Sequence, residues 1–160
     1  MRTFHFYKAQ QQELLIIYNI PRMQLIECIR GREVRIFSGE RIADTSVVFR
    51  IYLKPAHELY RILQYSETVH DQAGFCLHWG DRFICAPGPA GAEPPDGKRI
   101  SLLIVSASRK TIPEQIRPDQ VVADGTLSGK GLQRLKEQCE SRHIPFYSVR
   151  EQGAFVMTLP

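Results

Sequence analysis

Potential metal ligands are scattered along this sequence. Its histidines are His5, His57, His70, His78 and His143. No two of them have the spacing of two or four residues that lets two imidazoles on one strand, turn or helix face one metal ion. A metal site would have to be assembled from distant segments, and the plausible set is His70, His78, Asp81 and Asp124. Within that set, His78 and Asp81 are the best local pair, but a solvated hairpin tip is the simpler interpretation of both.

A glycine-rich segment, Gly125–Gly131, lies between a predicted strand and a predicted helix. Backbone amides at such a helix N-terminus can receive a phosphate. The segment departs from the phosphate-binding loop, which needs four residues between its glycines and Ser or Thr after the lysine. Here three residues separate Gly125 from Gly129, and Gly131 follows Lys130. Ser128 acting as a helix N-cap explains the segment without a ligand.

Basic side chains form the remaining candidate site. Ser106–Lys110 follows a predicted central strand, the place where open α/β sheets often bind ligands, although a polar loop leaving the sheet is the simpler interpretation. The net charge of +4 and the pI near 9.0 permit an acidic partner. Aromatic side chains do not alternate with the basic ones, so nucleic-acid binding is supported by net charge alone.

The elements that would position these residues are clearest in the last third of the chain. Ile100–Val105 is almost continuously apolar and predicts a central strand covered on both faces. A strand-helix-strand unit follows, and its two strands are expected to be parallel. Its helix carries an apolar stripe, and a C-terminal hairpin completes the region. The supporting segments are Gln120–Ala123, the stripe Leu132, Leu135 and Cys139, then Phe146–Val149 and Ala154–Leu159.

The N-terminal part predicts a β-meander. Its four candidate strands are Thr3–Tyr7, Glu13–Tyr18, Met23–Ile29 and Glu33–Phe37. In the fourth strand, the alternation places Val34 and Ile36 toward the core and Glu33 and Arg35 toward water.

The middle of the chain is less regular. Ser46–Leu53 is rich in β-branched and aromatic residues and predicts a fifth strand, although Ile42–Leu53 can also be read as a helix. A short helix is expected at Pro55–Gln64, with Leu59, Ile62 and Leu63 as its apolar stripe. A hairpin (Gly74–His78 with Arg82–Ala86) and a loop rich in proline and glycine (Pro87–Lys98) follow.

Composition supports a single globular domain. The 160 residues are 43% apolar, enough to bury a core, and no run of eighteen apolar residues could span a membrane. The cysteines form no C-x-x-C pair and lie within apolar patterns, so reduced, buried thiols are expected at Cys28, Cys76, Cys85 and Cys139. The fold class expected is α/β: an N-terminal β-meander plus a C-terminal mixed sheet with few helices.

Several segments together resemble one family. Arg150–Val156, preceded by Cys139 and His143–Pro145, resembles the extreme C-terminus of bacterial competence DNA-uptake channels of the ComEC type. Pro118–Gly125 is similar to the strand before the last helix in that family, and Tyr18–Pro21 and Leu53–Pro55 are similar to upstream segments in one of its branches. The resemblance covers nearly the whole chain.

The resemblance implies a metallo-β-lactamase-like tail domain, here truncated, that follows a transmembrane region. Residues 1–160 would then be a single soluble domain excised from a larger inner-membrane protein, whose transmembrane part is its partner. The face of the membrane stays open, although reduced cysteines fit poorly with an extracytoplasmic location.

Departures from the family predict a degenerate, non-catalytic version without metal or other cofactor. Metal-binding members have a strand that ends in a Gly-Asp pair and a later strand that runs into a His-His-Gly-Ser turn. The similar positions here, Arg82–Gly88 and Leu103–Arg109, retain no ligand, and the H-x-H-x-D-H segment is absent. The Gly80-Asp81 pair precedes its strand instead of ending it.

Two functions therefore remain open. The first is an accessory domain for DNA uptake, with weak DNA contact through Arg109, Lys110, Lys130 and Arg134 and with no catalytic residues. The second is a metal-dependent nuclease with relocated ligands, drawn from the histidine and aspartate set named above.

Overall fold

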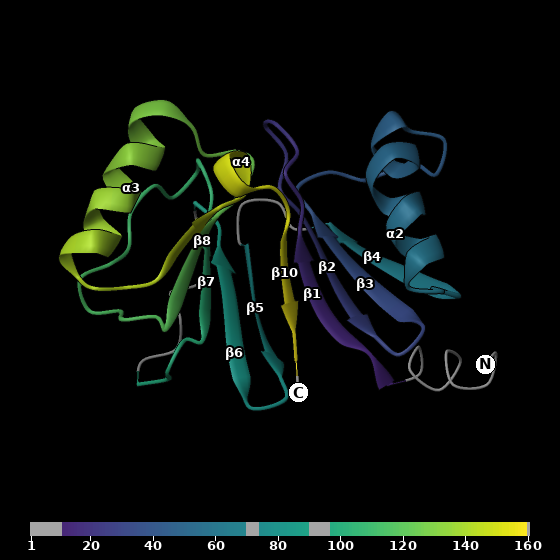
Figure 1. The fold of residues 1–160 in the computed structure, drawn as a ribbon, viewed down its shortest axis with the longest axis horizontal. Helices are drawn as coiled ribbons and strands as arrows, with labels where there is room; N and C mark the ends of the chain where they lie inside the picture. The colour runs from purple at the N-terminus through teal and green to yellow at the C-terminus, as the bar shows by residue number, and fades with distance from the viewer. Residues whose placement is uncertain (1–10, 70–73, 90–96, 160) are drawn as a thin grey trace.

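Two five-stranded sheets pack face to face and carry helices on their outer sides (Figure 1). This computed structural model describes residues 11–69, 74–89 and 97–159. The predicted strand Thr3–Tyr7 lies outside these residues. The strands are β1 (Glu13–Ile17), β2 (Leu25–Arg30), β3 (Glu33–Ser38), β4 (Gln64–Val69), β5 (Gly74–Trp79), β6 (Arg82–Pro87), β7 (Leu102–Val105), β8 (Gln120–Ala123), β9 (Phe146–Ser148) and β10 (Phe155–Thr158). The helices are η1 (Phe49–Leu53), α2 (Lys54–Leu59), α3 (Gly129–Ser141) and α4 (Val149–Gln152).

The first sheet has the strand order β10-β1-β2-β3-β4. Strands β1, β2 and β3 form the predicted antiparallel meander, whereas β4 is parallel to β3. In β3, Val34 and Ile36 are buried and Glu33 and Arg35 are exposed, as the alternation predicts. Strand β4 lies within a region to which the sequence patterns assigned no strand.

The second sheet has the strand order β5-β6-β7-β8-β9 and is also mixed. The predicted hairpin pairs β5 with β6, and β6 to β9 then run parallel to one another. The central strand β7 is buried along its whole length, because the other sheet covers one face and α3 covers the other. The α/β class, with two mixed sheets and few helices, is confirmed.

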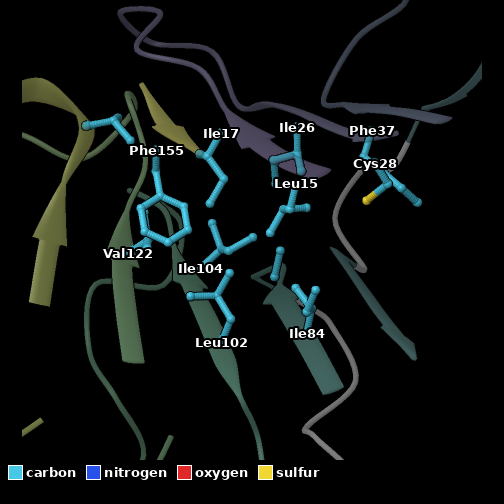
Figure 2. Packing of buried hydrophobic residues seen from close by; sticks show 12 residues of the cluster. Leu15, Ile17, Ile26, Cys28, Phe37, Ile84, Leu102, Ile104, Val122 and Phe155 are labelled. Carbon is cyan, nitrogen blue, oxygen red and sulfur yellow. The ribbon is translucent and has the colours of Figure 1, made fainter. Parts of the chain in front are cut away.

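The main core fills the space between the two sheets (Figure 2). Leu15 and Ile17 of β1 point toward Leu102 and Ile104 of β7, and Phe155 of β10 closes one side of the cluster. Odd-numbered residues of β1 and even-numbered residues of β7 face this core, which follows from the two-residue period of a strand. This packing fixes the register of both sheets.

Helix α3 covers the outer face of the second sheet. Leu135 and Cys139 are fully buried and Leu132 is partly buried, so the predicted stripe is confirmed. The helix joins β8 to β9, and these strands are parallel as expected for a strand-helix-strand unit.

Helices η1 and α2 cover the outer face of the first sheet as one continuous helical segment. The prediction of a strand at Ser46–Leu53 is therefore wrong, and the helical alternative is right for its second half. Leu53 is buried, and Phe49 and Tyr52 pack against the sheet beside it. β-branched and aromatic residues favour strands on propensity, but here burial against the sheet determines the conformation.

The stripe predicted for the second helix is also wrong. Leu59 and Leu63 are largely exposed, and Ile62 alone of the three packs against the sheet. The helix ends at Leu59, before the predicted end at Gln64.

The predicted C-terminal hairpin does not form. After β9, the short helix α4 redirects the chain to the other sheet, where β10 pairs antiparallel with β1. Gly153 permits this change of direction because its φ of 87° lies in a region that side chains rarely adopt.

The expectation of four reduced thiols is wrong for one pair. Cys76 and Cys85 form a disulfide across the β5–β6 hairpin, whose register places the two residues directly opposite each other. Cys28 and Cys139 are free and buried, as expected.

Candidate functional site

A cleft opens at the edge of the molecule where β6, β7 and β8 end. It has a volume of about 470 Å³. Segments connected to both sheets form its lining. The second sheet contributes Pro87, Gly88 and Pro89 at the end of β6, Ser106–Ser108 after β7 and Thr126 after β8. Arg22–Gln24 before β2 and Gly39 and Glu40 after β3 come from the connections of the first sheet. Ligands commonly bind beyond the carboxyl ends of parallel strands, so this cleft is the candidate site.

Asp124, directly after β8, organises the cleft. Its carboxylate accepts a 2.6 Å hydrogen bond from the Gln24 amide and a 2.9 Å bond from the backbone N–H of Thr126. The Thr126 hydroxyl also donates to it, and this hydroxyl in turn accepts a 2.8 Å bond from the N–H of Ala107. The carboxylate therefore ties the loop after β7 to the β1–β2 connection of the opposite sheet.

Burial raises the pKa of the Asp124 carboxyl above its ordinary value, and the hydrogen bonds from Thr126 and Gln24 oppose that shift. Neighbouring Gly125 lies against the backbone of Ile20, so that a Cβ at position 125 would sit 2.2 Å from the Ile20 carbonyl oxygen. Only glycine allows this approach, and Asp124 is thus held in place by its surroundings.

The structure does not bring the predicted metal ligands together. Asp81 lies in the turn before β6, at the end of the sheet opposite to Asp124, because β6 and β8 run parallel. His78 is exposed, and its Nε2 lies 3.2 Å from Nζ of Lys98. His70 lies outside the described residues. Among the residues the structure does describe, no three His, Cys, Asp or Glu side chains could hold a metal ion together.

Free thiols are poor candidates for a nucleophile here. Burial raises the pKa of Cys28 to about 12 and that of Cys139 to about 11. Both therefore stay protonated at neutral pH, and the thiolate is the reactive form of cysteine.

The predicted basic residues are brought together beside the cleft. Lys130 and Arg134 are exposed on successive turns of α3. Lys110 reaches the first turn of that helix, because its Cδ lies 3.6 Å from where a Cβ on Gly131 would be. Arg109 is half-buried in the turn that follows the cleft lining, and its N–H donates to the Ser106 carbonyl at 3.1 Å.

Positive potential is concentrated at this end of α3. In the described part of the chain, no ion pair involves Lys110, Lys130 or Arg134. Ser128 occupies the predicted N-cap position, but its hydroxyl forms no capping bond with the described residues. The positive end of the helix dipole therefore adds to the field of the three cations. Cations and amide donors in this arrangement are suited to contact phosphate oxygens.

A buried polar cluster of the first sheet was missed by the sequence analysis. Glu27 is fully buried under α2, where its carboxylate accepts a 2.7 Å bond from the Tyr18 hydroxyl and lies 2.6 Å from His57 Nε2. Burial, and then the Glu27 charge, raise the pKa of Tyr18. The signal was a single carboxylate on the same face as Leu25 and Ile29, within an apolar strand. The partners come from distant segments that only the fold brings together.

Comparison with known proteins gives one match. The family model described as the ComEC C-terminal domain matches residues 15–159, nearly the whole chain. No curated protein and no solved structure matches. In the described part of the chain, no helix is long and apolar enough to cross a membrane.

Proposed function

The chain belongs to the family of ComEC C-terminal domains, and from this premise we propose that it is a non-catalytic accessory domain of a DNA-uptake channel that contacts DNA through its basic cluster. The ComEC family is membrane-associated and is linked to competence. The chain would be one part of a larger membrane protein, with the transmembrane part as its partner.

The composition of the cleft is the observation that carries the non-catalytic role. In the metal-binding proteins that the chain resembles, the ends of two strands supply metal ligands. The similar positions here line the cleft and are Pro87, Gly88 and Ser106–Ser108. A two-metal hydrolase needs several imidazoles and carboxylates around its ions. Among the described lining residues, one, Glu40, carries a carboxylate. Asp124, at the end of β8, is already engaged by Gln24 and Thr126. We propose a metallo-β-lactamase-like scaffold that has lost its ion-binding groups.

The proposed DNA contact is supported by the gathering of Lys110, Lys130 and Arg134 around the amino end of α3, with Arg109 nearby. Contacts from such cations to phosphate supply affinity without sequence specificity. Because few cations take part, the binding should be weak, and because these contacts are electrostatic it should decrease as the salt concentration rises.

The test is fluorescence anisotropy with labelled single-stranded and duplex DNA over a series of salt concentrations. The triple variant Lys110→Ala/Lys130→Ala/Arg134→Ala should weaken binding and flatten its salt dependence, and Arg109→Ala should weaken it further. A matched control removes three exposed cations from the opposite helical layer: Arg50→Ala/Lys54→Ala/Arg61→Ala. This control has the same net charge and should bind DNA like the unaltered chain.

Equal loss of binding in both triple variants would mean that net charge alone attracts DNA, and would overturn the proposed contact site. Absence of DNA binding at low salt would do the same. The non-catalytic role is tested separately by metal analysis and by DNA cleavage assays with added zinc or manganese. Stoichiometric metal, together with cleavage that His78→Ala abolishes, would replace the proposal with a nuclease whose ligands have moved.

A further inference from the structure

The outer side of the helix formed by η1 and α2 is apolar, although nothing in the described chain covers it. Val47, Ile51 and Leu59 are 58%, 59% and 73% exposed, and Leu63, just beyond the helix, is 67% exposed. Val47, Ile51, exposed Pro55 and Leu59 follow one another at intervals of four, so they lie along one side of the helical segment, and Leu63 follows after the helix has ended. The inward side is apolar as well, since Phe49, Leu53 and Ala56 pack on the first sheet.

A charged stripe runs beside the exposed apolar one. Arg50, Lys54 and Glu58 are exposed and also follow at intervals of four, one position before Ile51, Pro55 and Leu59. Arg61 is exposed just after the helix. Three cations and one carboxylate therefore flank the apolar residues, and the net charge of this side is positive.

We propose that this side of the helical segment docks onto an anionic lipid surface, with Ile51 and Leu59 entering the headgroup region and Arg50, Lys54 and Arg61 contacting lipid phosphates. A helix that presents large apolar side chains next to lysine and arginine has the character of an interfacial helix. The chain belongs to a membrane-associated family, so a lipid surface would lie near this domain. The proposal does not depend on DNA contact, because the basic cluster lies around the amino end of α3, and α3 forms the opposite outer layer (Figure 1).

Charge distribution favours lipid over a second protein surface. A protein partner for an exposed apolar stripe is usually matched to it by shape and by paired charges. A lipid surface requires only apolar side chains that can enter it and cations beside them. The stripe meets this requirement, since Ile51 and Leu59 project from one side of the helix and three of the four neighbouring charges are positive.

The test is co-sedimentation of the 160-residue chain with vesicles made of equal parts phosphatidylcholine and phosphatidylglycerol, compared with phosphatidylcholine alone. The chain should bind the anionic vesicles and bind the neutral ones weakly. Ile51→Ser/Leu59→Ser should abolish binding to both. Arg50→Ala/Lys54→Ala should lower the partition coefficient on anionic vesicles by about 25-fold, because each cation near an anionic surface contributes about fivefold.

Val156→Ser is the matched control, because Val156 is a half-exposed apolar residue on β10, at the edge of the first sheet opposite to β4. It should bind vesicles like the unaltered chain, and circular dichroism should show that every variant is folded. Binding that is equal on neutral and anionic vesicles, unaffected by Ile51→Ser/Leu59→Ser, or absent would overturn the proposal. Sedimentation that instead shows a dimer dissolved by Ile51→Ser/Leu59→Ser, without vesicle binding, would assign the stripe to a second copy of the chain.

Discussion

The two outer helical layers use apolar residues in different ways. Helix α3 follows the simple amphipathic pattern, with Leu135 and Cys139 buried against one sheet and charged residues facing water. The helix of η1 and α2 is apolar on both sides and covers a sheet face in which Glu27 is buried. The apolar residues of α3 are therefore those that pack on the sheet, whereas the helix of η1 and α2 also carries apolar residues that do not pack on it.

This difference separates residues that stabilise the fold from residues that are available for contacts. In the α3 layer, apolar residues are buried, and exposed Lys130 and Arg134 form no ion pair with the described part of the chain. In the α2 layer, a buried polar cluster of Tyr18, Glu27 and His57 contributes to holding the helix, while apolar side chains remain outside. The comparison can be tested by substituting equivalent residues in the two layers.

The largest effect is expected for Leu135→Ala, in the α3 layer. The change removes a fully buried side chain and leaves a cavity, which should lower the free energy of unfolding by about 3 kcal/mol. Urea denaturation followed by circular dichroism measures this. A loss of less than about 1 kcal/mol would show that α3 repacks easily, and the contrast between the layers would disappear.

The next largest effect is expected for Glu27→Ala, in the α2 layer. Without the carboxylate, the buried Tyr18 hydroxyl and the partly buried His57 Nε2 lose their partner, so a loss of about 3 kcal/mol or slightly less is expected. Glu27→Gln keeps an acceptor for Tyr18 and should recover part of that loss in the same urea measurement. If both variants are as stable as the unaltered chain, the polar cluster does not hold the helix.

A smaller effect is expected at the cleft between the layers. Asp124→Ala leaves the donors of Gln24 and Thr126 unpaired and should cost about 2 kcal/mol. Asp124→Asn keeps an acceptor oxygen for Thr126, and the Gln24 amide can turn to match it, so the asparagine variant should be nearly as stable as the unaltered chain at neutral pH.

The stability of the chain should depend on pH through Asp124. Because burial raises the pKa of Asp124, the folded chain holds this proton at pH values where the unfolded chain has lost it. The stabilisation that this proton contributes is therefore fully present below the pKa that Asp124 has in the unfolded chain. It declines as the pH rises through the pKa that Asp124 has in the folded chain. Urea denaturation of Asp124→Asn over a range of pH should lack this decline, and an unchanged profile would contradict the prediction.

The smallest effect is expected for Leu59→Ala, the counterpart of the leucine substitution in α3. Leu59 is largely exposed, so its truncation should change the free energy of unfolding by less than about 0.5 kcal/mol. Urea denaturation measures this in parallel with Leu135→Ala. A loss comparable to that of Leu135→Ala would show that the apolar stripe is covered by another part of the molecule.

Local patterns were sufficient to predict much of the second sheet. The apolar run of β7 and the three- and four-residue spacing of Leu132, Leu135 and Cys139 each reflect burial that a single segment determines. The segment of η1 was predicted as a strand because both of its sides are apolar, which removes the periodicity that distinguishes a helix from a strand, whereas a helix was expected at α2.

Pairing between distant segments could not be predicted in the same way. The disulfide between Cys76 and Cys85 depends on the register of the hairpin, and the contact of Gln24 with Asp124 joins residues of different sheets. At the candidate site, the basic residues could be predicted from the sequence but the cleft could not, because segments from both sheets form its lining.

The pairing of β10 with β1 has a consequence for biosynthesis. Residues 155–158 complete the first sheet beside residues 14–17, so nearly the whole chain separates the two partners. On the ribosome, the exposed edge of β1 remains without its neighbour until the last residues of this domain have emerged. The nascent chain therefore presents an unpaired strand edge for most of its synthesis, and the final step of folding must follow translation of the domain.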